Sequence, residues 1–141
     1  MDLLPLETLA NATALTTTLA AHGNALSLNQ SGDVALALIY AVDTGGTGVE
    51  YVIEASLVDE PTSGDWIPLE EILDTSGTAA SGSLTAPSSR LVRQITTAQP
   101  SRLVVVGARG CRWLRVKAKE TTGSSISAAG TLTVHARIRI G

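Results

Sequence analysis

Residues 131–140, TLTVHARIRI, alternate polar and apolar side chains without interruption. Successive side chains of a β-strand point to opposite faces of its sheet, so this alternation predicts a strand with one face in a hydrophobic core. The face that we expect to pack inward carries Leu132, Val134, Ala136, Ile138 and Ile140. No segment of the chain shows the helical period of about 3.6 residues, so we expect a fold built from strands.

Shorter stretches of the same kind predict further strands, separated by turns rich in Gly, Asn and Ser. These strands are expected at 13–20, 25–28, 34–42, 49–58, 66–72, 91–96, 102–107 and 111–119. Glycines at 43–48 and 107–110 predict hairpin turns, and Pro68 predicts an edge position for its strand. The spacing predicts an all-β fold, a single-domain antiparallel β-sandwich or jelly roll of about eight to ten strands.

The first twelve residues, MDLLPLETLANA, precede the predicted strands. We expect them to form an N-terminal arm (1–12), followed by the sandwich domain (13–141). Leu3, Leu4 and Leu6 are costly to leave in water, because each carries a large apolar side chain. The arm is therefore expected to dock on the domain or on a neighbouring copy.

Charge is strongly segregated along the chain. Residues 1–75 contain twelve acidic residues and no Lys or Arg, whereas residues 76–141 contain all ten basic residues and one acid, Glu120. The two parts carry −12 and +9 within a net charge of −3, and such asymmetry indicates a contact between charged surfaces. Three contacts fit: between strands of one copy, between edges of two copies, or between the basic part and nucleic acid or another acidic surface.

The segment RGCRWLRVKAKE, residues 109–120, holds five of the ten basic residues. If the strands at 111–119 and 131–140 pair, as consecutive strands often do, their outer faces merge into one basic strip. This strip contains Trp113, Arg115, Lys117, Lys119, His135, Arg137 and Arg139. All of these except His135, together with Leu3, Leu4 and Leu6 of the arm, form the candidate assembly interface. On this interpretation, reversing the charges of Arg115 and Lys117 weakens assembly and leaves the monomer folded.

Residues that could carry catalysis or bind a metal are sparse. His22 and His135 are the only histidines and lack metal-ligand spacing, and the single Cys111 permits neither an intrachain disulfide nor a cysteine zinc site. A calcium site in the acidic loop 59–65 lacks the spacing of a known motif, so a solvated loop is the better interpretation. We expect no catalytic residue, no metal, no cofactor and no enzymatic activity.

From about residue 13 onward, the order of segments resembles that of a known class. A Gly-Asp-Trp sequence at 64–66 follows the acidic loop, an Arg-Trp-Leu-Arg-Val strand spans 112–116, and an alternating strand at 131–140 closes the chain. This pattern resembles the small β-sandwich proteins of tailed-bacteriophage virions, most of all the capsid decoration (cement) proteins. The match is one of pattern and order.

The resemblance implies a structural protein on the capsid exterior, synthesised in the host cytoplasm. It implies a homo-oligomer, expected to be a trimer, that binds the major capsid protein and stabilises the shell. A membrane partner is not expected, because the longest apolar run, 34–42, is too short to span a bilayer. Nucleic acid is an unlikely partner, because the net charge is negative and the basic part has one large aromatic residue, Trp113.

Two other functions fit the same sequence. One is a β-domain associated with the tail, collar or fibre of the virion. The other is a carbohydrate-binding module, in which Trp66 and Trp113 are the stacking platforms, although burial is the stronger interpretation for Trp66.

Overall fold

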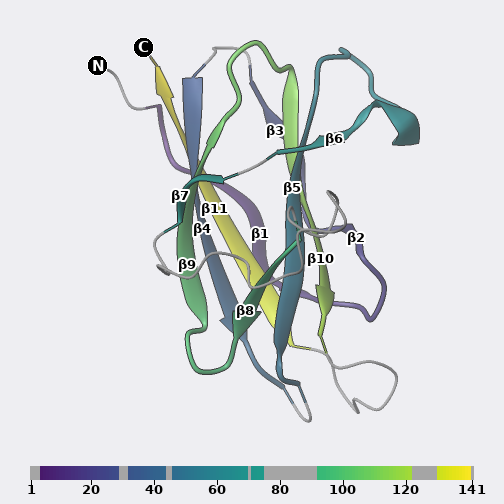
Figure 1. Ribbon diagram of the computed structural model, residues 1–141, viewed down its shortest axis with the longest axis vertical. Helices are drawn as coiled ribbons and strands as arrows, with labels where there is room; N and C mark the ends of the chain where they lie inside the picture. The colour runs from purple at the N-terminus through teal and green to yellow at the C-terminus, as the bar shows by residue number, and fades with distance from the viewer. Residues whose placement is uncertain are drawn as a thin grey trace, which may run out of the picture.

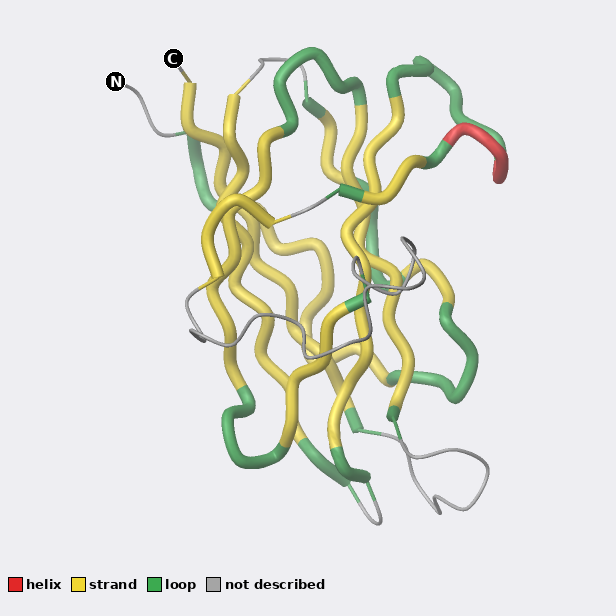
Figure 2. Tube along the Cα trace, viewed as in Figure 1, coloured by secondary structure: helices red, strands yellow, loops and turns green. Residues whose placement is uncertain are grey.

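Two antiparallel sheets pack face to face in the computed structural model (Figure 1). It describes residues 4–28, 32–43, 46–69, 71–74, 92–121 and 130–140, with the backbone alone for 71–74 and 140. Eleven strands and one short 3-10 helix, Ser63–Asp65, lie in these residues (Figure 2). The predicted all-β sandwich is confirmed.

The five-stranded sheet has the order β1-β11-β4-β9-β7. Its strands are β1 (Glu7–Ala14), β11 (Thr131–Ile140), β4 (Gly32–Ala41), β9 (Ser101–Gly107) and β7 (Glu71–Asp74). The six-stranded sheet is centred on two long strands, β5 (Gly48–Ser56) and β10 (Trp113–Glu120). Four short strands flank them: β2 (Ala20–Ala21) and β3 (Leu26–Ser27) pair with β10, and β6 (Ile67–Pro68) and β8 (Arg93–Thr96) pair with β5.

The core lies between the sheets and is built mainly from aliphatic side chains. The side chains that were predicted to face inward on β11 are buried at Leu132, Val134, Ala136 and Ile138. Leu114, Val116 and Ala118 of β10 are likewise buried from the opposite sheet. Removing this apolar surface from water is the main stabilising term of such a sandwich.

Successive long strands cross from one sheet to the other. The links β4–β5, β9–β10 and β10–β11 each join strands of different sheets, so the hairpins expected at 43–48 and 107–110 are wrong. The expected pairing of β10 with β11 is also wrong. Both strands are already paired on their two sides, β11 with β1 and β4, and β10 with β5 and the short strands β2 and β3. Neither has a free edge for the other.

The N-terminal strand lies earlier than predicted. It spans Glu7–Ala14, not 13–20, so the boundary expected between the arm and the domain at residue 12 falls inside β1. Leu9 and Ala10 are both buried although they are adjacent, because register shifts interrupt the pairing with β11, and Ala12 adopts a positive φ of 46°. These bulges break the two-residue period from which we placed the strand.

Pro68 lies at a sheet edge, as predicted. Strand β6 pairs only with β5 among the described strands, and proline lacks the N–H that a second partner would need. The chain then passes to β7 at the edge of the other sheet (Figure 1). The predicted loop at 74–90 lies outside the described residues beyond Asp74.

Candidate functional site

The outer face of the six-stranded sheet carries a matched pair of charges at its centre. The Arg115 Nε lies 2.8 Å from the Glu54 Oε1, and their side chains are only 21% and 10% exposed. The two residues are directly opposite in the β10–β5 register. The Trp66 ring stacks on the Arg115 guanidinium, 4.2 Å from ring centre to Cζ, and completes a partly desolvated cluster.

Three further ion pairs join an acid from the first part of the chain to a base from the second. Lys119 Nζ lies 3.2 Å from Glu50 Oε2, one of the other facing pairs of β10 and β5. Arg112 lies 3.4 Å from Asp59, and Arg109 lies 4.0 Å from Asp33. The segregated charges are thus neutralised within one copy at these positions, which is the first of the three contacts considered above.

Both tryptophans are engaged with arginines. The Trp113 indole Nε1 donates to the Asp59 carbonyl oxygen at 2.8 Å, and the Arg112 guanidinium lies 4.4 Å from the ring centre. Trp66 contacts Arg115 in the same way. A sugar ring stacks on an open aromatic face, so this arrangement disfavours the use of the two rings as a carbohydrate platform.

The predicted basic strip is divided between two sheets. Trp113, Arg115, Lys117 and Lys119 lie on β10 in the six-stranded sheet, whereas His135, Arg137 and Arg139 lie on β11 in the five-stranded sheet. Their outward-facing side chains therefore point to opposite sides of the sandwich, so the single strip is wrong. The two groups have to be considered as separate surfaces.

The outer face of the five-stranded sheet is apolar at its centre and basic at one end. Ile39 is 43% and Leu103 is 46% exposed, and they flank a ladder of small side chains on β4. Arg137 and Arg139 are exposed, and no described carboxylate lies within 4.0 Å of either. We call this surface the basic face; its residues are Asp33, Ala35, Ala37, Ile39, Leu103, Val105, Arg137 and Arg139, and Asp33 lies opposite Arg139 in the register.

A second uncovered apolar surface lies where β5 leaves its sheet. Leu57 is 67%, Val58 43% and Ile67 59% exposed. Ile67 pairs with Ala55, two residues before Leu57, so both exposed apolar residues lie at this end of the β5–β6 pair. We call Leu57, Val58, Asp59, Glu60 and Ile67 the acidic shoulder.

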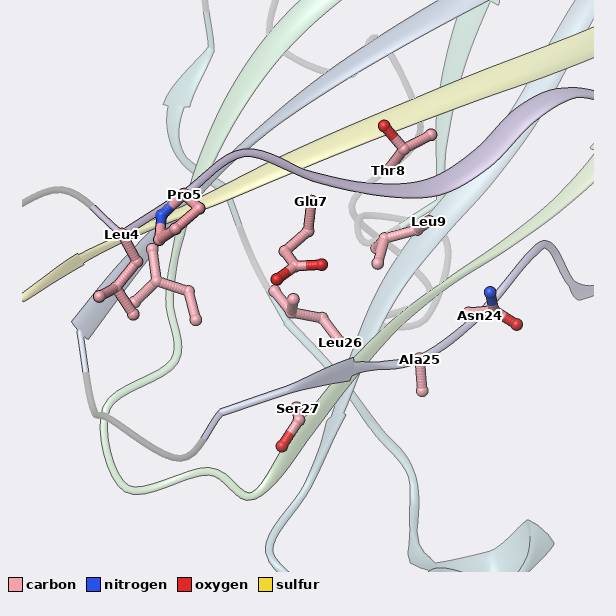
Figure 3. A pocket seen from close by; sticks show the side chains of 10 residues that line it. Leu4, Pro5, Glu7, Thr8, Leu9, Asn24, Ala25, Leu26 and Ser27 are labelled. Carbon is pink, nitrogen blue, oxygen red and sulfur yellow. The ribbon is translucent and has the colours of Figure 1, made fainter.

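A cavity of about 490 Å³ opens between the sheets at the N-terminal edge (Figure 3). Leu4, Pro5, Leu26 and Ile138 contribute apolar walls, and the Glu7 carboxylate points into it. Its full lining is Leu4, Pro5, Glu7, Thr8, Leu9, Asn24, Ala25, Leu26, Ser27 and Ile138.

The three leucines of the predicted arm differ in their positions. The Leu4 N–H donates to the Ile138 carbonyl oxygen at 3.0 Å, and its side chain packs against the core. Leu6 is 55% exposed beside the cavity, and Leu3 lies outside the described residues.

A buried polar contact that the sequence analysis missed links the two sheets. The Tyr40 hydroxyl of β4 donates to Glu120 Oε1 of β10 at 2.6 Å, and Glu120 is 1% exposed. Burial, and then the hydrogen bond to Glu120, raise the pKa of Tyr40 well above its usual value. A side chain at Gly46 would collide with both groups, so this glycine of the 43–48 loop allows the chain to close over the pair.

The signal for Glu120 was present in the sequence. Glu120 follows Leu114, Val116 and Ala118 at the same two-residue spacing. The alternation of β10 therefore places its carboxylate on the side that faces the core. His22 is also buried, and its Nε2 lies 2.9 Å from the Leu132 carbonyl oxygen. Glu120 and His22 each link chain segments across the core and lie away from the exposed surfaces.

Cys111 and the acidic loop do not form reactive or metal-binding clusters in the described part of the chain. Cys111 is half-buried against the core, and burial raises the pKa of its thiol. The Asp65 carboxylate accepts hydrogen bonds from the Thr62 N–H at 2.7 Å and the Thr62 hydroxyl at 3.0 Å, which occupy it within its own turn. No group of three or more His, Cys, Asp or Glu side chains with metal-binding geometry occurs in these residues.

Comparisons with known proteins reveal a similar fold at low sequence identity. No protein-family model and no curated protein sequence matches the chain. The SPBc2 prophage-derived protein YomS superimposes with a TM-score of 0.56 and 12% identity, covering 97% of this chain and 92% of that one. This chain therefore shares its β-sandwich fold with a prophage-derived protein.

A second solved structure is that of CorA from Methylomicrobium album BG8, described as a surface-associated copper-binding protein. It has a TM-score of 0.42 and 11% identity over 97% of this chain and 92% of that one. Among the described residues, no helix has the length and apolar character needed to cross a bilayer.

Proposed function

We propose that the protein is a structural component of a tailed-bacteriophage virion, and within that class a decoration (cement) protein of the outer capsid surface. The fold shared with a prophage-derived protein and the sequence pattern resembling virion sandwiches support the phage assignment. The role is structural and requires no enzymatic activity and no cofactor.

The main support for this proposal is that the protein exposes two separate apolar surfaces of different charge. The basic face exposes Ile39 and Leu103, and the acidic shoulder exposes Leu57 and Ile67. Exposed apolar side chains rimmed by charged residues are typical of interaction sites. Two such surfaces on different sides suit a protein that contacts several neighbours in a shell.

We assign the N-terminal edge to the contact with the major capsid protein. Leu6 is exposed there, and the adjacent cavity offers apolar walls around the Glu7 carboxylate. The two charged apolar surfaces then remain for contacts between copies, with a homotrimer as the expected assembly. Neither nucleic acid nor a membrane is a partner in this proposal.

Electron cryomicroscopy of phage particles with and without this protein tests the proposal. We expect density on the outside of the head that is absent from the deletion particles, and earlier release of DNA from those particles on heating. Density confined to the tail, collar or fibres would replace the capsid assignment with the tail-associated one. Absence of the protein from purified particles would refute a structural role in the virion.

A further inference from the structure

We propose that copies of this protein bind one another head to tail, with the acidic shoulder of one copy on the basic face of the next. This inference deepens the proposed function, on which it rests, by naming the two surfaces that meet. The occupant of the basic face is thus a second copy of the same chain.

The apolar parts of the two surfaces match in kind. Leu57 and Ile67 project from the shoulder with 67% and 59% of their surface exposed. The basic face offers Ile39 and Leu103 around the small side chain of Ala37, which pairs with Leu103 in the β4–β9 register. Large side chains opposite small ones allow close packing, and burial of apolar surface supplies most of the affinity of such a contact.

The charges of the two surfaces are complementary. Arg137 and Arg139 on the face have no ion-pair partner within 4.0 Å among the described residues. On the shoulder, Glu60 is exposed, and the Asp59 side chain remains 89% exposed even though it contacts Arg112. Opposite charges at the rim orient two partners and disfavour the wrong pairing of face with face or shoulder with shoulder.

The positions of the two surfaces make the contact intermolecular. The shoulder lies at the β5–β6 end of the six-stranded sheet, whereas the basic face is the outer side of the five-stranded sheet, across the sandwich (Figure 1). One copy cannot join its own two surfaces. A contact between two different surfaces is head to tail, and repeated copies form a ring where the rotation between them closes.

The test compares native masses of charge-reversed variants by multi-angle light scattering and sedimentation. The face variant is Arg137→Glu with Arg139→Glu, and the shoulder variant is Asp59→Lys with Glu60→Lys. We expect the wild type to be an oligomer, and each variant alone to associate at least about tenfold more weakly, because like charges then meet.

A fourfold charge swap separates a specific contact from a loss of folding. A chain carrying both the face and the shoulder reversals has its charges complementary again, so it should regain the oligomer mass. An equimolar mixture of the two half-reversed proteins should likewise form mixed complexes. Thermal unfolding of each variant is the control for folding, and we expect each monomer to unfold cooperatively near the wild-type temperature.

Neutral substitutions test the apolar part with a matched control. Leu57→Ser with Ile67→Ser should weaken association, whereas Val42→Ser should not, since Val42 is 53% exposed but lies on neither surface. Raising the salt concentration should weaken the wild-type oligomer, because salt screens the charges at the rim of the contact. The oligomer of the fourfold swap variant should weaken to the same extent.

Several results would overturn the contact. A wild type that stays monomeric, variants that keep the wild-type mass, or a folded swap variant that fails to reassociate would each do so. The location of the protein on particles is an independent measurement. An unaffected oligomer on a correctly decorated head would refute this contact alone, whereas a correct swap result with no protein on particles would refute the virion role alone.

Discussion

The two outer faces of the sandwich use the same basic residue types in opposite ways. On the six-stranded sheet, Arg115 and Lys119 of β10 each have a carboxylate directly across on β5. On the five-stranded sheet, Arg137 and Arg139 of β11 have no described carboxylate within 4.0 Å. A cluster of positive charge in a sequence therefore indicates an available surface only where the neighbouring strand leaves it unmatched.

The register explains this difference for Arg115, Lys119 and Arg137. Glu50 and Glu54 on β5 have the same four-residue spacing as Arg115 and Lys119 on β10, so antiparallel pairing brings both pairs together. On β4, the residue opposite Arg137 is Ala35. Asp33 lies opposite Arg139, but its carboxylate is directed to Arg109 at 4.0 Å.

The largest effect should come from reversing a matched charge. Arg115→Glu is expected to reduce the free energy of unfolding by about 3 kcal/mol, because it leaves the buried Glu54 carboxylate beside a second negative charge. Urea denaturation measures this loss. The sequence pattern alone led us to expect a folded monomer here; the structure changes that expectation, because Arg115 belongs to a desolvated pair.

The double variant Arg115→Glu with Glu54→Lys is the matched control. It restores opposite charges at the same two positions, and a double-mutant cycle isolates the interaction between them. We expect it to recover part of the lost stability. A single variant that loses less than about 0.5 kcal/mol would mean that the pair is screened like a surface ion pair.

The second effect tests the aromatic cover of the same pair. Trp66→Ala should cost about 1 kcal/mol, because it removes the ring stacked on Arg115 and lets water reach the pair. Trp66→Phe keeps an aromatic face and should cost less. Equal losses in the two variants would show that stacking on the guanidinium contributes nothing.

The strand faces and one edge could be predicted from the sequence. The alternation of polar and apolar residues predicted the buried sides of β10 and β11 correctly, and Pro68 predicted that its strand lies at a sheet edge. Both signals are local in the sequence. The positions of adjacent buried residues, such as Leu9 and Ala10, could not be predicted. They depend on bulges that form only when β1 pairs with β11, a strand more than a hundred residues later.

The pairing of strands was the part of the fold that the sequence predicted worst. The predicted basic strip was wrong because it depended on this pairing. Local alternation reveals which side of β10 faces the core but not which strand lies beside it. The basic strip joined Arg115 to Arg137 on the assumption that consecutive strands pair. The four-residue spacing shared by the Glu50/Glu54 and Arg115/Lys119 pairs was the sequence signal that favoured β5 as the neighbour of β10.

The third effect compares exposed and covered pairs on one face. Lys119→Ala should cost no more than about 0.5 kcal/mol, because the side chains of Lys119 and Glu50 are 36% and 35% exposed. The loss should shrink further in high salt, whereas the loss from Arg115→Glu should change little. Unfolding curves at low and high salt check both, and equal salt dependence would contradict the difference in burial.

The smallest effect on stability should come from the unmatched face. Arg137→Glu with Arg139→Glu reverses two charges and places one of them opposite Asp33, yet it should change the free energy of unfolding by less than about 0.5 kcal/mol, because both side chains are exposed and no described carboxylate lies within 4.0 Å of either. The same kind of reversal at Arg115 should cost several times more. A destabilisation of the Arg137/Arg139 variant as large as that of Arg115→Glu would mean that the basic face is held within its own copy. A variant that keeps its stability but loses association would instead show that this face contributes to contacts between copies, since charges without partners in the monomer can be reversed at little cost to the fold.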